Sequence, residues 1–77
     1  MRQPLYRLLL GEKGIIKQII ADKATKERLH TFGLIKDVTI VPIKNTPLGC
    51  PRIYRCLNTS IAIRNSVAKQ IEVETKL

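Results

Sequence analysis

Three side chains in this sequence are of types that bind transition metals: Cys50, Cys56 and His30. Protein metal sites usually take thiolate and imidazole ligands from closely spaced pairs. Here the two cysteines stand six positions apart and the histidine is isolated, so the spacing predicts no metal site. We expect Cys56 to pack on one face of a strand and His30 to lie on the exposed side of a helix.

Side chains that could carry out catalysis are dispersed as well. The closely spaced acidic pair, Glu72 and Glu74, would share the solvated side of a strand. Neither Ser60 nor Ser66 has a base predicted beside it. The sequence also contains no glycine-rich loop of the kind that cradles phosphates. It therefore predicts a protein that is not an enzyme and that uses no cofactor.

The charge balance favours anionic partners. Fourteen Lys and Arg against six Asp and Glu give a formal charge of +8 in 77 residues, which would attract nucleic acid, phospholipid headgroups or an acidic protein surface. The basic residues are scattered, however, and with no Trp, one Phe and two Tyr the chain lacks the stacking platforms of single-strand binders. No nucleic acid is expected as a partner.

Segments for export or membrane insertion are not predicted. Arg7 interrupts the apolar stretch near the N-terminus, and no small-residue cleavage site follows it. No window approaches the roughly 20 apolar residues of a membrane span, and two cysteines do not make a disulfide framework. These features predict a cytoplasmic protein.

Short apolar runs separated by turn residues are typical of a small barrel. Strands are predicted over 15–20, 38–44, 52–57, 60–63 and 71–74, a helix over 26–32, and a turn or single helical turn over 65–69. Asp22 or Thr25 would cap the helix, and Leu29 and Phe32 would face the barrel together. We therefore predict one mainly β domain over residues 1–77: an SH3-like, partly open barrel of about five strands with one or two short helices. An OB-fold is the competing architecture.

Single residues sharpen this prediction at the turns. Gly33 stands where a helix ends in a left-handed residue. Pro42 cannot donate to a strand ladder, which predicts an edge or a bulge there. Asn58 and Thr59 form the expected two-residue hairpin turn.

The ordered motifs resemble the FeoA family, small cytosolic components of bacterial ferrous-iron uptake systems. The resemblance covers nearly the whole chain and rests mainly on Gly11, Glu12, Gly14, Arg28, Leu29, Gly33, Leu34, Pro47, Leu48, Gly49, Pro51, Ala62, Ile63 and Arg64. Asp37 and Asn58 stand where the family usually has glycine, and both tolerate left-handed backbone angles. Cys50 replaces an aspartate of the family loop.

The resemblance implies an accessory or regulatory component of bacterial ferrous iron uptake. Such a protein would act as a protein-interaction module on the cytosolic part of the large Feo membrane transporter, and would reach the inner membrane only through that partner. Ferrous iron prefers nitrogen and oxygen ligands, so tight binding by Cys50, Cys56 or His30 is not expected. The alternative is a small basic SH3-like domain that binds nucleic acid or is linked to transcription.

The loop over residues 47–51 is the predicted contact surface. Its prolines would stiffen it, and Leu48 at its tip would be an apolar anchor. The sequence leaves open whether Leu48 is exposed or folds back to cap the barrel. Charged neighbours would steer the encounter. The predicted partner-binding residues are Pro47, Leu48, Gly49, Pro51, Lys44 and Arg52.

Overall fold

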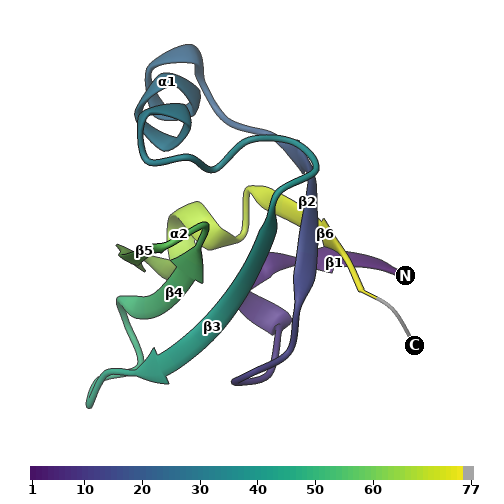
Figure 1. Ribbon diagram of the computed structural model, residues 1–77. Helices are drawn as coiled ribbons and strands as arrows, with labels where there is room; N and C mark the ends of the chain where they lie inside the picture. The colour runs from purple at the N-terminus through teal and green to yellow at the C-terminus, as the bar shows by residue number, and fades with distance from the viewer. Residues whose placement is uncertain (76–77) are drawn as a thin grey trace.

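The computed structural model describes residues 1–75 as one bent antiparallel sheet with short helices at its ends (Figure 1). The strands are β1 (Arg2–Pro4), β2 (Gly14–Ile19), β3 (Thr39–Asn45), β4 (Arg52–Cys56), β5 (Thr59–Ile63) and β6 (Ile71–Glu74). A 3₁₀ helix, η1 (Leu5–Arg7), follows β1, and the α-helices are α1 (Lys23–Thr31) and α2 (Asn65–Ala68). The mainly β prediction is confirmed, with one strand more than expected.

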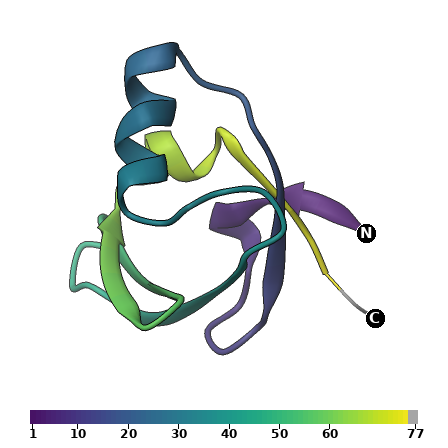
Figure 2. The same ribbon diagram turned by 45° about the horizontal axis from the view of Figure 1, so that its top comes forward.

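The strands lie in the order β1-β6-β2-β3-β4-β5, so the last strand is inserted between the first two. In β6, Val73 pairs with Gln3 of β1 on one side and with Ile16 of β2 on the other. Figure 2 shows the strands curling around an interior rather than forming a flat layer. Among residues 1–75, neither helix has the length and apolar character needed to cross a membrane.

The interior is filled by aliphatic side chains from every part of the chain. Gly14 lies at its tightest point, because a Cβ there would come within 3.0 Å of Leu8 Cδ1 and of Val73 Cβ. Any larger residue would push Leu8, which follows η1, or Val73 of β6 away from β2. The buried cluster comprises Leu5, Leu8, Ile16, Leu29, Leu34, Ile40, Tyr54, Cys56, Ile63, Ala68, Ile71 and Val73.

Helix α1 begins earlier than predicted, at Lys23, and Asp22 rather than Thr25 caps it. The Thr25 amide donates to Asp22 Oδ1 at 2.8 Å, and hydrogen bonding from Thr25 lowers the pKa of the Asp22 carboxyl. A side-chain acceptor at this position satisfies an amide that has no partner within the helix.

The end of α1 corrects the prediction that Phe32 faces the core. Gly33, at φ 90°, reverses the chain as predicted, and the Leu34 amide donates to the Leu29 carbonyl at 3.0 Å. This closing pattern packs the residue after the glycine against the last helical turn. Leu34 is therefore buried with Leu29, while Phe32 is 49% exposed.

Left-handed backbone angles were predicted in two turns, and the structure places a positive φ in each of them. Asp37 has φ 73°, as predicted. In the second turn the prediction is wrong by one residue: Cys56 pairs with Thr59, so the hairpin loop is Leu57 and Asn58, and Leu57 carries the positive φ of 57°. The predicted bulge at Pro42 is confirmed, since the pairing of β3 with β4 shifts register between Pro42 and Lys44.

These turns predict different tolerances to a β-branched residue. Asp37→Val should lower the free energy of unfolding by about 1 kcal/mol or more, because valine is strained at a positive φ. Asn58→Val should change it by less than about 0.5 kcal/mol, since Asn58 is exposed and has no positive φ. Asp37→Asn controls for loss of the exposed contact between Lys17 and Asp37. Urea unfolding curves measure all three variants, and equal losses at positions 37 and 58 would contradict the turn assignment.

Candidate functional site

The candidate metal ligands lie in three separate places. His30 is exposed on α1, Cys50 is exposed in the β3–β4 loop, and Cys56 is buried in β4. Within residues 1–75, no group of three or more His, Cys, Asp or Glu side chains is close enough to hold a metal ion. The fold does not bring the three predicted candidates together.

The two thiols have different surroundings. The Cys56 thiol donates to the Gly33 carbonyl across 3.7 Å, and its burial raises the pKa of the thiol. Cys50 Sγ accepts a hydrogen bond from the Asn65 amide at 3.4 Å. Cys50 therefore links the β3–β4 loop to the start of α2.

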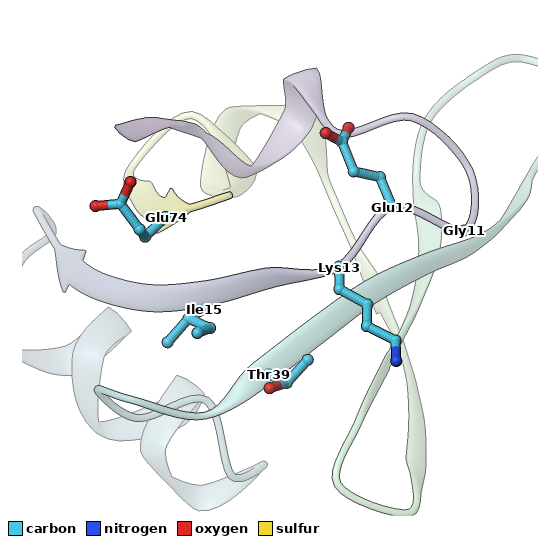
Figure 3. Close-up of a pocket in the computed structure, with 6 residues that line it drawn as sticks. All are labelled: Gly11, Glu12, Lys13, Ile15, Thr39 and Glu74. Carbon is cyan, nitrogen blue, oxygen red and sulfur yellow. The ribbon is translucent and has the colours of Figure 1, made fainter. Parts of the chain in front are cut away.

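A hollow between β2, β3 and the preceding turn is lined by Gly11, Glu12, Lys13, Ile15, Thr39 and Glu74. Its side chains do not converge on a common point (Figure 3). Glu12 accepts a hydrogen bond from the Leu9 amide at 2.9 Å and so closes its own turn. The Glu74 carboxylate is paired with the N-terminal ammonium. Both carboxylates thus have structural partners.

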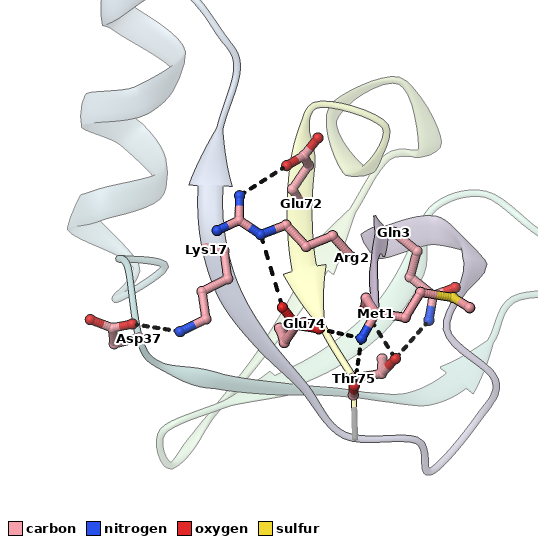
Figure 4. A network of polar contacts seen from close by, with 8 residues as sticks. All are labelled: Met1, Arg2, Gln3, Lys17, Asp37, Glu72, Glu74 and Thr75. Carbon is pink, nitrogen blue, oxygen red and sulfur yellow. Dashed lines mark hydrogen bonds and ion pairs between the residues drawn. The ribbon is translucent and has the colours of Figure 1, made fainter. Parts of the chain in front are cut away.

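A network of ion pairs joins the two ends of the described chain (Figure 4). The Arg2 guanidinium lies 3.7 Å from Glu72 and 4.0 Å from Glu74. The N-terminal ammonium, hydrogen-bonded to Glu74, holds the pKa of that carboxyl below its usual range. Glu72 and Glu74, considered above as a catalytic pair, therefore hold β1 against β6.

The predicted contact loop, residues 47–51, projects at the end of the molecule opposite α1 (Figure 1). Leu48 is 93% exposed, so it does not cap the barrel. The loop is nevertheless ordered by its own hydrogen bonds. The Gly49 amide donates to the Thr46 carbonyl at 2.9 Å, and Thr46 Oγ1 donates to the Pro51 carbonyl at 2.7 Å. Leu48 is thus an exposed leucine on a loop that is ordered by internal hydrogen bonds.

The loop forms one wall of an open groove of about 630 Å³, and η1 with the residues after it forms the other. The groove is lined by Tyr6, Arg7, Leu8, Leu9, Asn45, Thr46, Pro47, Leu48, Gly49, Arg52 and Asn65. Of the predicted contact residues, Pro47, Leu48, Gly49 and Arg52 line it. Lys44 and Pro51 are exposed but lie outside its lining.

Arg52 spans the two walls of the groove. Its Nε donates to Asn45 Oδ1 at 2.9 Å, and its Nη1 donates to the Tyr6 carbonyl at 3.1 Å. The guanidinium also lies 5.7 Å from the centre of the Tyr54 ring. The sequence predicted a steering charge at the rim of the contact surface. In the structure Arg52 is a fixed, half-buried member of the groove.

A basic and aromatic cluster that the sequence did not predict lies on the opposite wall. Arg7 Nε donates to the Tyr6 hydroxyl at 3.4 Å, and the Arg7 guanidinium and Lys69 Nζ each lie 5.9 Å from the Tyr6 ring centre. The hydrogen bond from Arg7 lowers the pKa of the Tyr6 hydroxyl. Only the neighbouring Tyr6 and Arg7 could have been noticed in the sequence, since Lys69 comes from the far end of the chain.

The FeoA domain model matches residues 3–75 of this sequence. The chain belongs to the FeoA family. The predicted resemblance is thereby confirmed over nearly the whole chain, and the groove is a feature of a FeoA-family domain. Comparison with curated protein sequences gave no match.

Solved FeoA structures have the same fold. The solution structure of iron(II) transport protein A from Clostridium thermocellum superposes with a TM-score of 0.90 at 30% sequence identity. The match covers 95% of this chain, which spans 45% of the length of that protein. A crystal structure of an iron uptake regulatory protein, FeoA, has a TM-score of 0.88 at 28% sequence identity. That match covers 99% of this chain and 100% of the FeoA chain.

The predicted SH3-like fold is also confirmed. The zinc complex of FeoA from Stenotrophomonas maltophilia, described as a prokaryotic SH3 domain protein, has a TM-score of 0.78 at 26% identity; 96% of this chain and 89% of that chain are covered. A manganese-dependent transcriptional repressor shares the fold alone, with a TM-score of 0.86 at 14% identity.

The contrast between the thiols predicts selective alkylation. Iodoacetamide at neutral pH should modify Cys50 in the folded protein much faster than Cys56, because Cys56 is buried and its pKa is raised. Mass spectrometry of proteolytic fragments measures both rates. In denaturant the two rates should become similar. Equal rates in the folded protein would contradict the placement of Cys56 in the core.

Proposed function

We propose that this FeoA-family domain is an accessory component of bacterial ferrous iron uptake. It acts by protein contact on the cytosolic part of the large Feo transporter and carries out no chemistry itself. The family membership supports a role in ferrous iron transport. So do the similar structures, one named iron(II) transport protein A and another described in connection with activation of ferrous iron transport.

The observation that carries the contact role is the exposure of Leu48 on an ordered loop. A leucine that is 93% exposed contributes little to the domain's own core. Hydrogen bonds within the loop limit the conformational entropy lost on docking. Binding surfaces commonly consist of such loops held by a rigid scaffold. The loop therefore has the properties of a docking anchor.

We propose that the domain has no catalytic activity because its polar side chains are engaged in structural contacts or are buried. The carboxylates of Glu12, Glu72 and Glu74 hold turns and strands together. The Cys56 thiol is buried. The side chains of Glu12, Lys13 and Thr39 line one hollow but do not converge on a common point there. As part of the same proposal, the domain works in the cytoplasm and reaches the membrane only through the transporter.

Leu48→Ala tests the contact role. The variant should keep its melting temperature within a few degrees of the original, because the side chain is exposed, and should lose binding to the transporter. A tagged domain and a detergent extract containing the transporter measure binding by co-purification. Growth of a deletion strain under iron limitation measures the effect in the cell.

Ile20→Ala is the matched control for this test. Ile20 is also an exposed aliphatic residue, at 55%, and directly follows β2 on the side of α1. This variant should bind the transporter as the original does. If wild-type domain and transporter do not co-purify, the proposed function is wrong. If they co-purify equally well with Leu48→Ala, the loop is not the contact surface.

A further inference from the structure

The basic residues around the groove have no acidic partner within residues 1–75. The ion pairs of this part of the chain join Arg2 and the N-terminal ammonium to β6, and Lys17 to Asp37. Arg7 and Arg52 line the groove, Lys69 lies beside it on Tyr6, and no carboxylate is in its lining. The groove therefore offers basic side chains that no carboxylate of residues 1–75 neutralises.

Arg52 is positioned to bind an anion. Of the five N–H donors of a guanidinium, the structure uses one on Asn45 and one on the Tyr6 carbonyl. These two bonds fix the plane of the group, and a ligand would share its remaining donors with the neighbouring Tyr54 side chain. A planar, pre-oriented guanidinium binds a carboxylate with little further loss of side-chain entropy.

Apolar side chains accompany these charges. Leu48 on one wall is 93% exposed, and Leu9 on the other is 73% exposed. A ligand that fills the groove would cover both leucines while its charges face Arg7 and Arg52. Such a ligand must carry negative and apolar groups close together.

We propose that the groove binds an acidic segment of a partner protein, with carboxylates against Arg7 and Arg52 and an apolar side chain between Leu9 and Leu48. The inference rests on the proposed function, since it describes the segment that this module would recognise on its partner. Lys69 adds to the positive potential at the groove and raises the rate of encounter.

A second copy of this chain is a poor occupant. Glu12 closes a turn, Asp22 caps α1 and Asp37 lies on Lys17. Glu72 and Glu74 are paired with Arg2 and the N-terminal ammonium. Glu27 is the one remaining acidic residue of the six in the sequence, so residues 1–75 offer no acidic segment without structural partners to a second groove.

Nucleic acid and anionic lipid fit less well. The aromatic ring in the lining, Tyr6, already has two cations near its centre, so it is a poor platform for a base. Exposed leucines on both walls add nothing to contacts with a nucleic-acid phosphate, whereas an apolar residue of a peptide would bury them. The hollow between the 47–51 loop and η1 suits a peptide segment better than the flat surface of a lipid bilayer. The combination of charge and apolar surface favours a protein segment.

Peptide titration tests this proposal on the full chain. The probe is a short synthetic peptide with several Asp and Glu residues flanking a central leucine. In ¹⁵N-labelled protein its addition should shift the amides of Tyr6, Arg7, Leu48 and Gly49 saturably, and added NaCl should weaken binding. Two control peptides are matched to this probe: in one, Asn and Gln replace the Asp and Glu residues, and in the other, Ser replaces the central leucine. Each should bind at least about tenfold more weakly than the probe.

Charge-matched variants locate the binding. Arg7→Gln with Lys69→Gln should weaken the acidic peptide about tenfold or more, since both side chains are exposed and are not needed for the fold. Lys23→Gln with Lys26→Gln removes the same charge from α1 and should leave the affinity nearly unchanged. Equal losses in the two double variants would show binding by net charge alone and overturn the proposal.

Other results also overturn the proposal. These are shifts centred on α1, equal binding of the uncharged peptide, or tighter binding of oligothymidine or phosphatidylglycerol vesicles at the groove. The proposed function is tested separately by transporter co-purification. If the transporter binds but the acidic peptide does not, this inference fails alone. If the peptide binds at the groove but the transporter does not, the transporter assignment fails and the groove keeps its acidic ligand.

Discussion

The close approach of backbone and side chains at Gly14 is the constraint on which this structure depends. A Cβ there would lie only 3.0 Å from Leu8 and Val73, so β2 lies directly against both the residue after η1 and the last strand. That contact sets η1 at the rim of the sheet, where the Tyr6 carbonyl can accept from Arg52. The groove between η1 and the 47–51 loop is thus a consequence of packing in the core.

Most acidic side chains of the molecule already have structural partners. Five of the six acidic side chains accept hydrogen bonds or ion pairs that hold turns, a helix start and the sheet. Among residues 1–75, none of these acids forms an ion pair with Arg7, Arg52 or Lys69 at the groove. Unpaired cations around a hollow favour the approach of an anionic ligand.

Much of the fold could be predicted from local chemistry. Gly33 and Asp37 were assigned correctly because only a few residue types tolerate positive φ, and Pro42 because it lacks the amide that a regular ladder needs. β1 was missed because three residues ending in proline show no alternation. The groove could be predicted only in part, since Arg52 and Tyr6 meet through tertiary packing that no spacing along the chain reports.

The contact between Leu57 and Gly33 joins the end of α1 to the β4–β5 hairpin. A side chain at position 33 would begin 3.1 Å from Leu57 Cδ1, and Leu57 itself holds a left-handed conformation that few residues adopt without strain. A side chain at position 33 would have to displace the tip of the exposed Leu57 side chain as well as adopt a positive φ. The left-handed turns that end α1 and connect β4 to β5 are therefore in contact, although they are remote in sequence.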